Sequence, residues 1–555
     1  MSENRQIART AGLVGALTLC SRVTGLLRDS VVGYFFGSGL AADAFFVAFR
    51  IPNLLRRFVA EGAMNVAFIP VFTDYLTNRT REEAVEVARV LATTMTVLLA
   101  LLTVAGILLA PVSVWLFAPG FTADPEKADL TIQLTRLLFP YIFLVSVAAL
   151  LGGLLNSLRH FAAPAFSPVL FNLAMIFAAL LLCRLFTTPV YGLAFGVLLG
   201  GFLQIIVQVP ALRRHGIVLK RLWQPRHAAV RRVLLLMIPT VFGAAVYQIN
   251  VMMDTVFASV LPAGSVSYLW YADRVFEFPL GLFAVALGTA ALPSFSAQAA
   301  RKAYGEMRQS LTFAIGLTNL VTIPAAVGFM VLAKPITAVL FQRGAFGPAQ
   351  VDMTAWALST FAVGLWSVSV VRILVPAFYA LNDTRTPVVT AAAAFVANMV
   401  FSLMLIGRVQ SDGTSSIVAA IAWATAKVGI WDLRHAGLAL STSLAATVNL
   451  ILLAVVLSRR LGRFDLATMA RSLMRNVVAA MVMAPAVAFA AGWIDWHVRG
   501  QLAVKIAVLT AAMTVGVVVF GLTAYVLGGP EIDGVRRILR QRLGYDRTAN
   551  EAGSG

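Results

Sequence analysis

The sequence has little charge and few residues with reactive side chains. Only 12% of its 555 residues are charged, and it contains 2 cysteines and 5 histidines. The two cysteines, Cys20 and Cys183, stand in separate apolar stretches, and no HExxH or paired Cys/His spacing occurs. These absences argue against a zinc site or a redox pair, and the sequence indicates no cofactor.

Motifs for nucleotide hydrolysis and covalent catalysis are also missing. There is no Gly-x-x-x-x-Gly-Lys-Ser/Thr loop, whose backbone would hold the phosphates of ATP. The histidines are scattered over predicted loops and helix ends, and no pair of nucleophile and base stands out. We therefore expect a protein that is not an enzyme and has no ATPase of its own.

Hydrophobic residues are abundant instead, at 59% of the chain with a mean hydropathy of +0.84. A soluble chain of this length would need more polar residues to cover its surface. Apolar runs long enough to cross a bilayer as helices, about 20 residues each, recur from end to end. The sequence predicts an all-α polytopic membrane protein with about 14 transmembrane helices. The predicted spans are 10–36, 42–73, 88–117, 131–157, 164–186, 190–212, 233–260, 266–297, 310–333, 352–380, 386–407, 437–458, 473–494 and 503–528.

The predicted orientation in the membrane explains the net charge of +19. With the N-terminus in the cytoplasm, most of the 44 Lys and Arg residues fall in the N-terminus, the even-numbered loops and the C-terminal tail. Two basic segments, 213–232 and 534–542, would then face the anionic inner leaflet. We expect both termini to be cytoplasmic, and we expect no nucleic-acid partner.

The chain shows weak internal repetition. "RDSVVGYFFGSGLAADAFFVAFRIP" (28–52) and "MDTVFASVLPAGSVSYLWYADRVFEFP" (253–279) each place a Gly-containing turn between an Asp-bearing helix and a helix that ends in Pro. Repeated halves are typical of transporters that bind their cargo between the halves. The predicted parts are an N-lobe (1–212), a basic connector (213–232), a C-lobe (233–460), a terminal helix pair (461–530) and a basic tail (531–555).

Residues 409–436 do not fit this pattern. The segment is polar at both ends, and its apolar middle is too short to span the membrane easily. We expect a periplasmic loop with a re-entrant or surface-lying piece.

Charges inside the predicted membrane segments gather near the start of the chain. Asp43, Arg50, Arg57 and Glu61 are separated by 7, 7 and 4 residues, which places them on one stripe of a helix. Each charge pointed at lipid would cost roughly 2.5–3.5 kcal/mol. The charges must therefore face one another, a wet cavity or the interface. The first two spans hold Arg22, Arg28, Arg50, Arg56 and Arg57 against Asp29, Asp43 and Glu61.

This surplus of arginine has two interpretations. A cationic cavity would suit an anion, and the planar guanidinium fork suits a phosphate. Alternatively, the charges are ion pairs that brace the helices, with Arg57 and Glu61 forming an i, i+4 pair. In the second half of the chain, Asp273, Arg274 and Glu277 lie within about one turn of one another.

Several motifs resemble one known family. "SRVTGLLRD" (21–29), "ADAFFVAFRIPNLLRRFVAEGA" (42–63) and "SVSYLWYADRVFEFPLG" (265–281) closely resemble the MurJ (MviN) family of bacterial lipid II flippases. The resemblance continues through "PAFSPVLFN", "LNDTRTPV" and "HAGLALSTSLAATVN". It covers nearly the whole chain except 409–434, the extreme N-terminus and the tail.

The resemblance implies the fold of the multidrug/oligosaccharidyl-lipid/polysaccharide exporter superfamily. Two six-helix lobes would form a V around a central cationic cavity, and two further helices would form a groove for a lipid tail. The implied cargo is lipid II, the undecaprenyl-diphosphate-linked peptidoglycan precursor. It would move by alternating access from the inner to the outer leaflet of the bacterial cytoplasmic (inner) membrane. The implied partners are lipid II, membrane lipids and cell-wall synthesis proteins.

The resemblance also implies functional residues. It assigns transport roles to Arg22, Arg28, Asp43, Arg50, Asn53, Arg56, Glu61, Ser267, Asp273, Arg274 and Glu277. Some members bind sodium, which would place Asp254 and Asn398 at such a site, although Ser402 is neutral where a second carboxylate would help. Coupling to sodium or to the membrane potential would then replace ATP.

Two alternatives stay open at this stage. A flippase or exporter of the same fold could carry another polyprenyl-linked oligosaccharide or a drug, although a cationic drug would need an acidic cavity. A membrane glycosyltransferase that uses the same lipid would need a catalytic carboxylate in a large extracytoplasmic loop, and most predicted odd-numbered loops are short.

The charge distribution predicts the topology directly. Single cysteines in 118–130 and 409–436 should react from outside with a membrane-impermeant reagent, and cysteines in 213–232 should not. The background lacks Cys20 and Cys183. Labelling of 213–232 from outside would show that the orientation is opposite to the predicted one, and with it the direction of transport.

Overall fold

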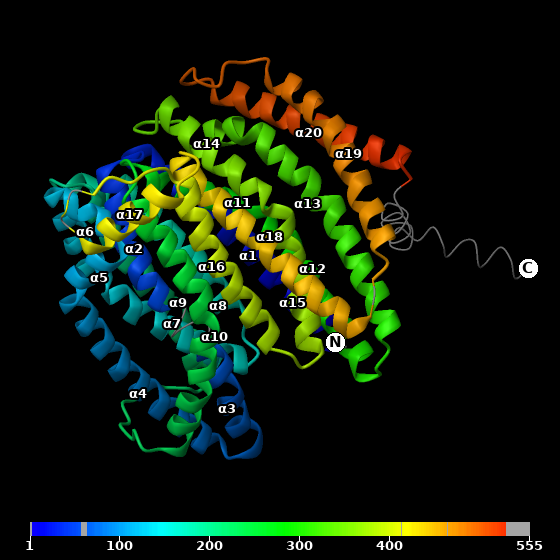
Figure 1. Ribbon diagram of the computed structural model, residues 1–555. Helices are drawn as coiled ribbons and strands as arrows, with labels where there is room; N and C mark the ends of the chain where they lie inside the picture. Colours follow the sequence, from blue (N-terminus) through cyan, green and yellow to red (C-terminus); the bar gives the residue numbers. More distant parts are fainter. Residues whose placement is uncertain (1–2, 57–63, 412, 414, 463, 529–555) are drawn as a thin grey trace, which may run out of the picture. The chain divides into compact units, whose positions relative to one another are not determined.

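The computed structural model describes residues 3–56, 64–411, 413, 415–462 and 464–528. These residues form helices throughout and no strands (Figure 1), which confirms the all-α fold class. In chain order the first helices are α1 (Glu3–Phe36), α2 (Leu40–Arg56), α3 (Met64–Asn78), α4 (Arg81–Leu108), α5 (Ala110–Phe117), η2 (Pro119–Ala123), α6 (Pro125–Leu138), α7 (Pro140–Ser157), α8 (Ala162–Leu180), η3 (Leu182–Leu185), α9 (Val190–Arg214) and α10 (Ala228–Ser259). The others are α11 (Ser265–Pro279), η4 (Leu280–Ala284), α12 (Val285–Ala300), α13 (Tyr304–Phe341), α14 (Pro348–Val363), α15 (Leu365–Ala380), α16 (Arg385–Leu405), α17 (Ser416–Val428), α18 (Arg434–Leu461), α19 (Leu466–Ala491) and α20 (Leu502–Val526).

The chain divides into two compact units. Unit 1 comprises Met1–Tyr271, Arg343–Gln350 and Ile406–His435. Unit 2 comprises Ala272–Gln342, Val351–Leu405 and Ala436–Gly555. The predicted lobes are a different division of the chain, and they stay a prediction. The predicted tail, 531–555, lies outside the described residues.

Each predicted span corresponds to one helix or to consecutive helices, and proline explains several of the breaks. Pro111 lies in the first turn of α5, and Pro140 is the first residue of α7. Proline lacks the N–H that would continue the preceding helix. Among the described residues, nine helices are long and apolar enough to cross a membrane, or ten if α14 and α15, bent by 44°, count as one. The count of fourteen stays a prediction.

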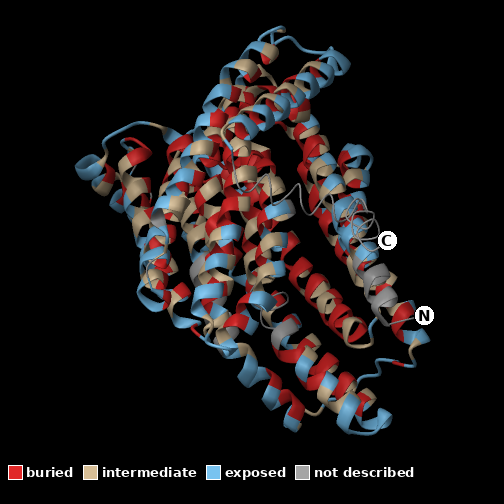
Figure 2. Cartoon of the chain, turned by 90° about the vertical axis from the view of Figure 1, so that its right-hand side faces the viewer, coloured by how far each residue is buried: buried red, intermediate tan, exposed pale blue. Residues whose placement is uncertain are grey.

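Figure 2 shows helices with buried residues along one side and exposed residues along the other, and many of the exposed residues are large and apolar. On α20, for example, Val517 and Val526 are exposed while Ala512 and Gly516 are buried. An exposed valine is unfavourable in water but suits hydrocarbon, so these faces indicate contact with lipid.

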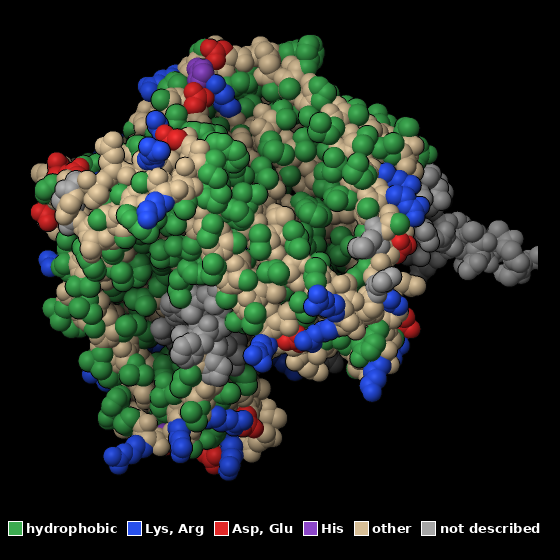
Figure 3. Space-filling view, viewed as in Figure 1, with side chains coloured by type: hydrophobic (Ala, Val, Ile, Leu, Met, Phe, Trp, Pro, Cys, Tyr) green, Lys and Arg blue, Asp and Glu red, His purple; other side chains and the backbone are tan. Residues whose placement is uncertain are grey.

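Two predicted even-numbered loops meet at one end of unit 1. Arg81, at the start of α4, donates a hydrogen bond to the carbonyl of His215 (2.8 Å), and Arg89 donates one to the carbonyl of Val218 (2.9 Å). Arg232 pairs with Asp74 at the end of α3 (2.7 Å). Figure 3 shows Lys and Arg side chains gathered where α3 and the start of α10 lie. The structure therefore brings the basic connector and the α3–α4 turn to the same end of the unit.

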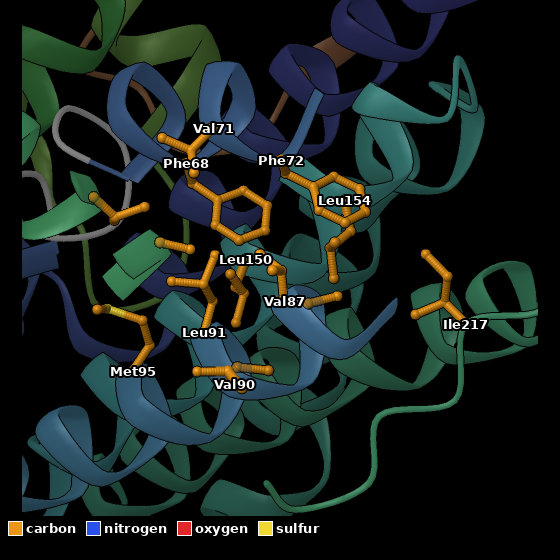
Figure 4. Close-up of a cluster of buried hydrophobic side chains, with 14 of the residues drawn as sticks. Phe68, Val71, Phe72, Val87, Val90, Leu91, Met95, Leu150, Leu154 and Ile217 are labelled. Carbon is orange, nitrogen blue, oxygen red and sulfur yellow. The ribbon is translucent and has the colours of Figure 1, made fainter. Parts of the chain in front are cut away.

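A hydrophobic cluster holds α3, α4 and α7 together at this end. Phe68 and Phe72 of α3 stack with their ring centres 5.6 Å apart, and they pack against buried leucines of α4 and α7. Figure 4 shows Phe72 beside Leu154 of α7. Burying side chains of this size typically contributes about 1.5–3 kcal/mol each.

Glycines on one face of α9 allow α8 and the following turn η3 to approach closely. A Cβ atom at Gly192 would come 2.6 Å from the backbone of Cys183, and one at Gly200 would come 2.6 Å from the ring of Phe171. A Cβ at Gly196 would overlap that of Ala178. The four-residue spacing is typical of close helix packing in membranes, and it is a signal that our sequence analysis missed. The packing matters for the site because it fixes Phe171 and, next to it, Asn172.

This packing generates a prediction. Gly196→Ala should lower the melting temperature in detergent, because overpacking a tight contact typically costs about 1–3 kcal/mol. The matched control is Gly328→Ala on α13, where an added Cβ would meet nothing within 4 Å. Alanine is the better helix former, so the control should melt at the same temperature or higher. Equal melting of both variants would contradict this account of the α8–α9 contact.

Candidate functional site

Arg28, on α1, is held in place by neighbours on two helices. Its Nε and Nη2 donate to Oδ1 of Asp29 (3.0 and 2.8 Å), and its Nη1 donates to Oδ1 of Asn172 on α8 (3.0 Å). The amide of Asn172 in turn donates to the carbonyl of Ser21 (3.0 Å). The guanidinium also lies 5.9 Å from the ring centre of Phe171. These contacts fix an arginine inside the unit, where a mobile charge would be costly.

Arg50, on α2, is fixed in a similar way. Its Nη1 donates to the hydroxyl of Thr255 on α10 (2.7 Å), and its Cζ lies 5.3 Å from the ring centre of Trp270 on α11. A guanidinium can stack on an aromatic face while it keeps donors in its plane, and an ammonium group lacks this geometry. Thr255 and Trp270 were not among the predicted site residues.

Aromatic side chains join the surroundings of the two arginines. Phe46 stacks on Trp270 with ring centres 4.7 Å apart, and Phe49 lies near both Trp270 (6.0 Å) and Phe171 (6.5 Å). They line a pocket that also includes Arg28 and Asp29. The pocket has room for about one water molecule, so it is too small for a sugar.

A larger pocket opens nearer the N-terminal end of α1. It has a volume of about 350 Å³. Its lining comes from α1, α7 and the start of α8: Val14, Thr18, Ser21, Asn156, Phe161, Pro164, Ala165 and Pro168. Ser21 is seven residues before Arg28 on the same helix, which corresponds to about 10 Å along its axis. The pocket and the arginine are therefore linked through Ser21, whose carbonyl holds Asn172.

Asp43, on α2, is a buried carboxylate with several hydrogen-bond donors around it. It is 1% exposed, and its Oδ2 accepts from Nζ of Lys127 on α6 (2.9 Å) and from the backbone N–H of Gly264 (2.8 Å). Its Oδ1 accepts from the N–H and the hydroxyl of Ser267 (3.0 and 2.6 Å). The aspartate thereby caps the start of α11 and joins α2, α6 and α11. Lys127 also lies 3.9 Å from the ring centre of Phe121.

These contacts bear on the two interpretations of the charged stripe. Asp43 and Ser267 bind each other, and Asp43 pairs with Lys127, so the bracing interpretation fits Asp43. Arg50, on the same stripe, has different partners on α10 and α11. Lys127 was missed because it falls in the predicted loop 118–130. The transport roles assigned to Asp43 and Ser267 stay predictions.

The other predicted residues of unit 1 are less fully described. Arg22 is half-buried on α1, and no hydrogen bond or ion pair joins it to another described residue. Asn53 and Arg56 lie in the last turn of α2, and Oδ1 of Asn53 is buried without a hydrogen-bond donor among the described residues. Glu61 and Arg57 lie outside the described residues, so the predicted Arg57–Glu61 pair stays a prediction.

The acidic and basic residues predicted for α11 belong to unit 2. Arg274 and Glu277 form an ion pair between successive turns (3.3 Å), and both side chains are partly exposed. Asp273 precedes Arg274 on the same helix. The structure confirms that Arg274 and Glu277 lie within reach of each other, and their role in transport stays a prediction.

The sodium site suggested by the resemblance stays a prediction. Asn398 is buried on α16, and Ser402, one turn later, shares a hydrogen bond with Ser441 (2.8 Å) and brings no second carboxylate. Asp254 lies on α10 in unit 1. The described residues contain no group of three or more His, Cys, Asp or Glu side chains that could hold a metal ion.

One motif of the resemblance has a structural explanation. Asp383, in "LNDTRTPV", accepts hydrogen bonds from the backbone N–H groups of Arg385 and Thr386, and it pairs with Arg460 on α18 (2.8 Å). Burial raises the pKa of Asp383, but the hydrogen bonds from Thr386 and the charge of Arg460 outweigh it and lower the pKa overall. The carboxylate thus caps α16 and ties it to the end of α18.

Comparison with known proteins identifies relatives along most of the chain. The family model described as "Lipid II flippase MurJ" matches residues 32–507. The "Probable lipid II flippase MurJ" of Vibrio cholerae is 36% identical over 461 residues, which are 81% of this chain and 82% of the relative. The "Lipid II flippase MurJ" of Burkholderia cenocepacia is 35% identical over 520 residues, which are 93% of this chain and 96% of the relative.

Solved structures show the same fold. A structure described as "Lipid II flippase MurJ, inward closed conformation" matches with a TM-score of 0.73 and 23% identity, covering 93% of this chain and 98% of its own. An inward-facing multidrug resistance MATE transporter of the MOP superfamily matches with a TM-score of 0.63 and 15% identity, covering 79% and 94%. At these identities the likeness concerns the fold alone.

The contacts of Asp43 generate a prediction. Asp43→Asn should lower the melting temperature strongly, because it leaves the Lys127 ammonium buried without its counter-charge, and breaking a buried pair costs about 3–5 kcal/mol. The double variant Asp43→Asn with Lys127→Met should recover part of that loss. Thermal unfolding of the two single variants and the double variant measures the coupling. Strict additivity would show that the pair does not brace the fold.

Proposed function

The chain belongs to the MurJ lipid II flippase family, and we propose that it moves lipid II across the membrane. In this proposal Arg28 and Arg50 receive the diphosphate once the helices around the small pocket beside Arg28 have moved apart. The observation that carries the assignment of lipid II is the match of the family model over residues 32–507. Two relatives that are 35% and 36% identical support it over most of their length. The roles proposed for Arg28 and Arg50 rest on the contacts described above.

The chemistry of the cargo fits the two arginines. A diphosphate presents several anionic oxygens, and a guanidinium binds such oxygens through paired N–H donors. Arg28 has five N–H donors, as every arginine does, and three of them bind Asp29 and Asn172. Its remaining donors are already oriented by these contacts, so little side-chain entropy is lost when an anion binds.

The pocket beside Ser21 offers space for part of the head group. Its volume of about 350 Å³ is at the lower end of the usual range for small-molecule sites. Thr18, Ser21 and Asn156 supply polar groups to its lining. We assign this pocket to a sugar of the head group, with the diphosphate towards Arg28.

The polyprenyl tail has a different requirement, because it can stay in hydrocarbon while the head group crosses. In unit 2, α19 and α20 pack against each other and expose apolar side chains, among them Phe489, Val517 and Val526. This helix pair supports our assignment of the tail to the segment 461–530.

Direction must come from a source other than ATP. The sequence has no phosphate-binding loop for ATP. A cationic site that moves within the field of the membrane would gain about 2.3 kcal/mol per charge per 100 mV. We propose alternating access biased by the membrane potential.

The orientation follows from the basic end of unit 1. Arg81, Arg89 and Arg232 tie the connector 213–232 to the ends of α3 and α4. The positive-inside rule assigns this end to the cytoplasm, which supports a location in the bacterial inner membrane with both termini cytoplasmic. Contact with cell-wall synthesis proteins stays a prediction.

The relatives favour lipid II over the two alternatives. A cationic-drug exporter would need an acidic site. The candidate site in unit 1 instead contains two arginines, Arg28 and Arg50, which lie against aromatic rings. The MATE transporter shares the fold alone at 15% identity. A glycosyltransferase finds no support among these relatives.

Arg28→Lys tests the diphosphate assignment. Lysine keeps the charge beside Asp29 but loses the planar fork, so flipping should fall to a small fraction of its normal rate while the melting temperature stays nearly unchanged. The readout is exposure of lipid II at the outer leaflet of vesicles that contain the purified protein. The control is Arg81→Lys, because Arg81 donates to a backbone carbonyl at the surface. Normal flipping by Arg28→Lys would show that a point charge suffices, and loss of folding would make Arg28 a structural residue.

A further inference from the structure

The segment between α16 and α18 contains a helix too short to cross the membrane. α17 has 13 residues, Ser416–Val428, which correspond to about 20 Å against a hydrocarbon core of about 30 Å. The segment 409–434 is also one of the parts of the chain that the resemblance does not cover. The resemblance therefore implies no role for this segment.

One face of α17 packs on unit 1. Val418, Ile421 and Thr425 are buried on this face, and α17 contacts η2, the turn between α5 and α6. The hydroxyl of Thr425 accepts from the backbone N–H of Val409 (3.1 Å). A bridge between Ile406 and Asp432 closes the two ends of the segment. α17 is therefore held on the unit.

Large apolar side chains are exposed on α17, where Trp423 lies opposite the buried face, and in the residues that follow its end. Trp423 is 63% exposed, Ile430 60% and Trp431 62%, and Val428 is also exposed. The ammonium group of Lys427 lies 4.0 Å from the ring centre of Trp423. A tryptophan next to a lysine is the combination that membrane proteins place at the boundary between hydrocarbon and head groups.

The neighbours of α17 place it at that boundary. Ile406 follows directly on Leu405, the last residue of α16, and the bridge to Asp432 keeps Trp431 close to this point. η2 follows α5, which ends a predicted span and exposes Trp115 and Leu116 in its last turns. Both connections put the exposed tryptophans at the level where membrane-spanning helices end.

We propose that α17 and the residues up to Trp431 form an interfacial anchor that lies in the head-group region of the outer leaflet. Trp423, Val428, Ile430 and Trp431 enter the lipid, and Lys427 faces the lipid phosphates. Amphipathic helices with aromatic residues on one face bind membrane surfaces in this way. Only the choice of leaflet rests on the proposed orientation. The basic connector contacts the start of α4, whereas η2 follows α5, beyond the other end of α4.

The anchor would hold a turn that matters for the site. The backbone N–H of Gly120 in η2 donates to the hydroxyl of Ser259 at the end of α10 (3.1 Å). A few residues on, Lys127 of α6 reaches Asp43, which caps α11. A lipid contact at α17 would therefore act on η2, the turn that precedes the helix of Lys127.

Spin labels measure this depth directly. Single variants Trp423→Cys and Trp431→Cys are labelled in the full chain, in a background with Cys20→Ser and Cys183→Ala. The protein is placed in nanodiscs of phosphatidylethanolamine and phosphatidylglycerol. Power saturation compares collision with oxygen, which dissolves in lipid, and with a water-soluble nickel chelate. Ser411→Cys, in the exposed loop, is the aqueous control, and Val517→Cys, on the exposed face of α20, is the lipid control.

Both tryptophan positions should lie between the two controls, with oxygen favoured over nickel. Labels at Val428 and Ile430 repeat the measurement with smaller changes if a tryptophan variant does not fold. Nickel access equal to that at position 411 would place the surface in water and overturn the proposal. Protection from both reagents would show that protein covers the surface, and it would also overturn the proposal.

Discussion

The buried carboxylate of Asp43 is the constraint on which the arrangement of unit 1 depends. An ionised group at 1% exposure is stable only when its oxygens are fully paired, and here a lysine, two backbone N–H groups and a hydroxyl supply the donors. The donors come from α6 and from the start of α11, so the charge fixes both against α2. Two helical turns along α2, Arg50 then meets Thr255 and Trp270.

The sequence predicted the helices well because apolar length and proline are local signals. It also predicted that Arg28, Asp43 and Arg50 lie within helices, and the structure has them on α1 and α2. The partners were not predictable, because helical periodicity shows which residues share a face but not what lies opposite. Asp43 and Arg50 share a stripe, yet they bind different helices. Lys127 carried a misleading signal, since it lies in a stretch that reads as a loop. Asn172 is the last residue of the motif "PAFSPVLFN", but it carries no charge, so the charge pattern did not identify it.

The arginines of unit 1 combine charge with an apolar setting. Arg28 and Arg50 each use a polar partner to fix the guanidinium and an aromatic ring to cover one of its faces. Such an arrangement excludes water, so the attraction to an anion is less screened than it would be at the surface. It also shows how a chain with only 12% charged residues can keep cations within its helices.

The two helix contacts beside Asn172, α8 with α9 and α1 with α8, differ in how easily they can change. Between α8 and α9 the glycines leave backbone against side chain with no intervening space, so these two helices must shift as one piece. Between α1 and α8 the amide of Asn172 bonds the carbonyl of Ser21, the hydroxyl of Thr24 and the guanidinium of Arg28. Hydrogen bonds of this kind can be exchanged for water or for phosphate oxygens at little net cost. If helices in this part of unit 1 move, the movement would therefore occur mainly between α1 and α8, at the hydrogen bonds of Asn172. The helices α8 and α9 would stay packed against each other.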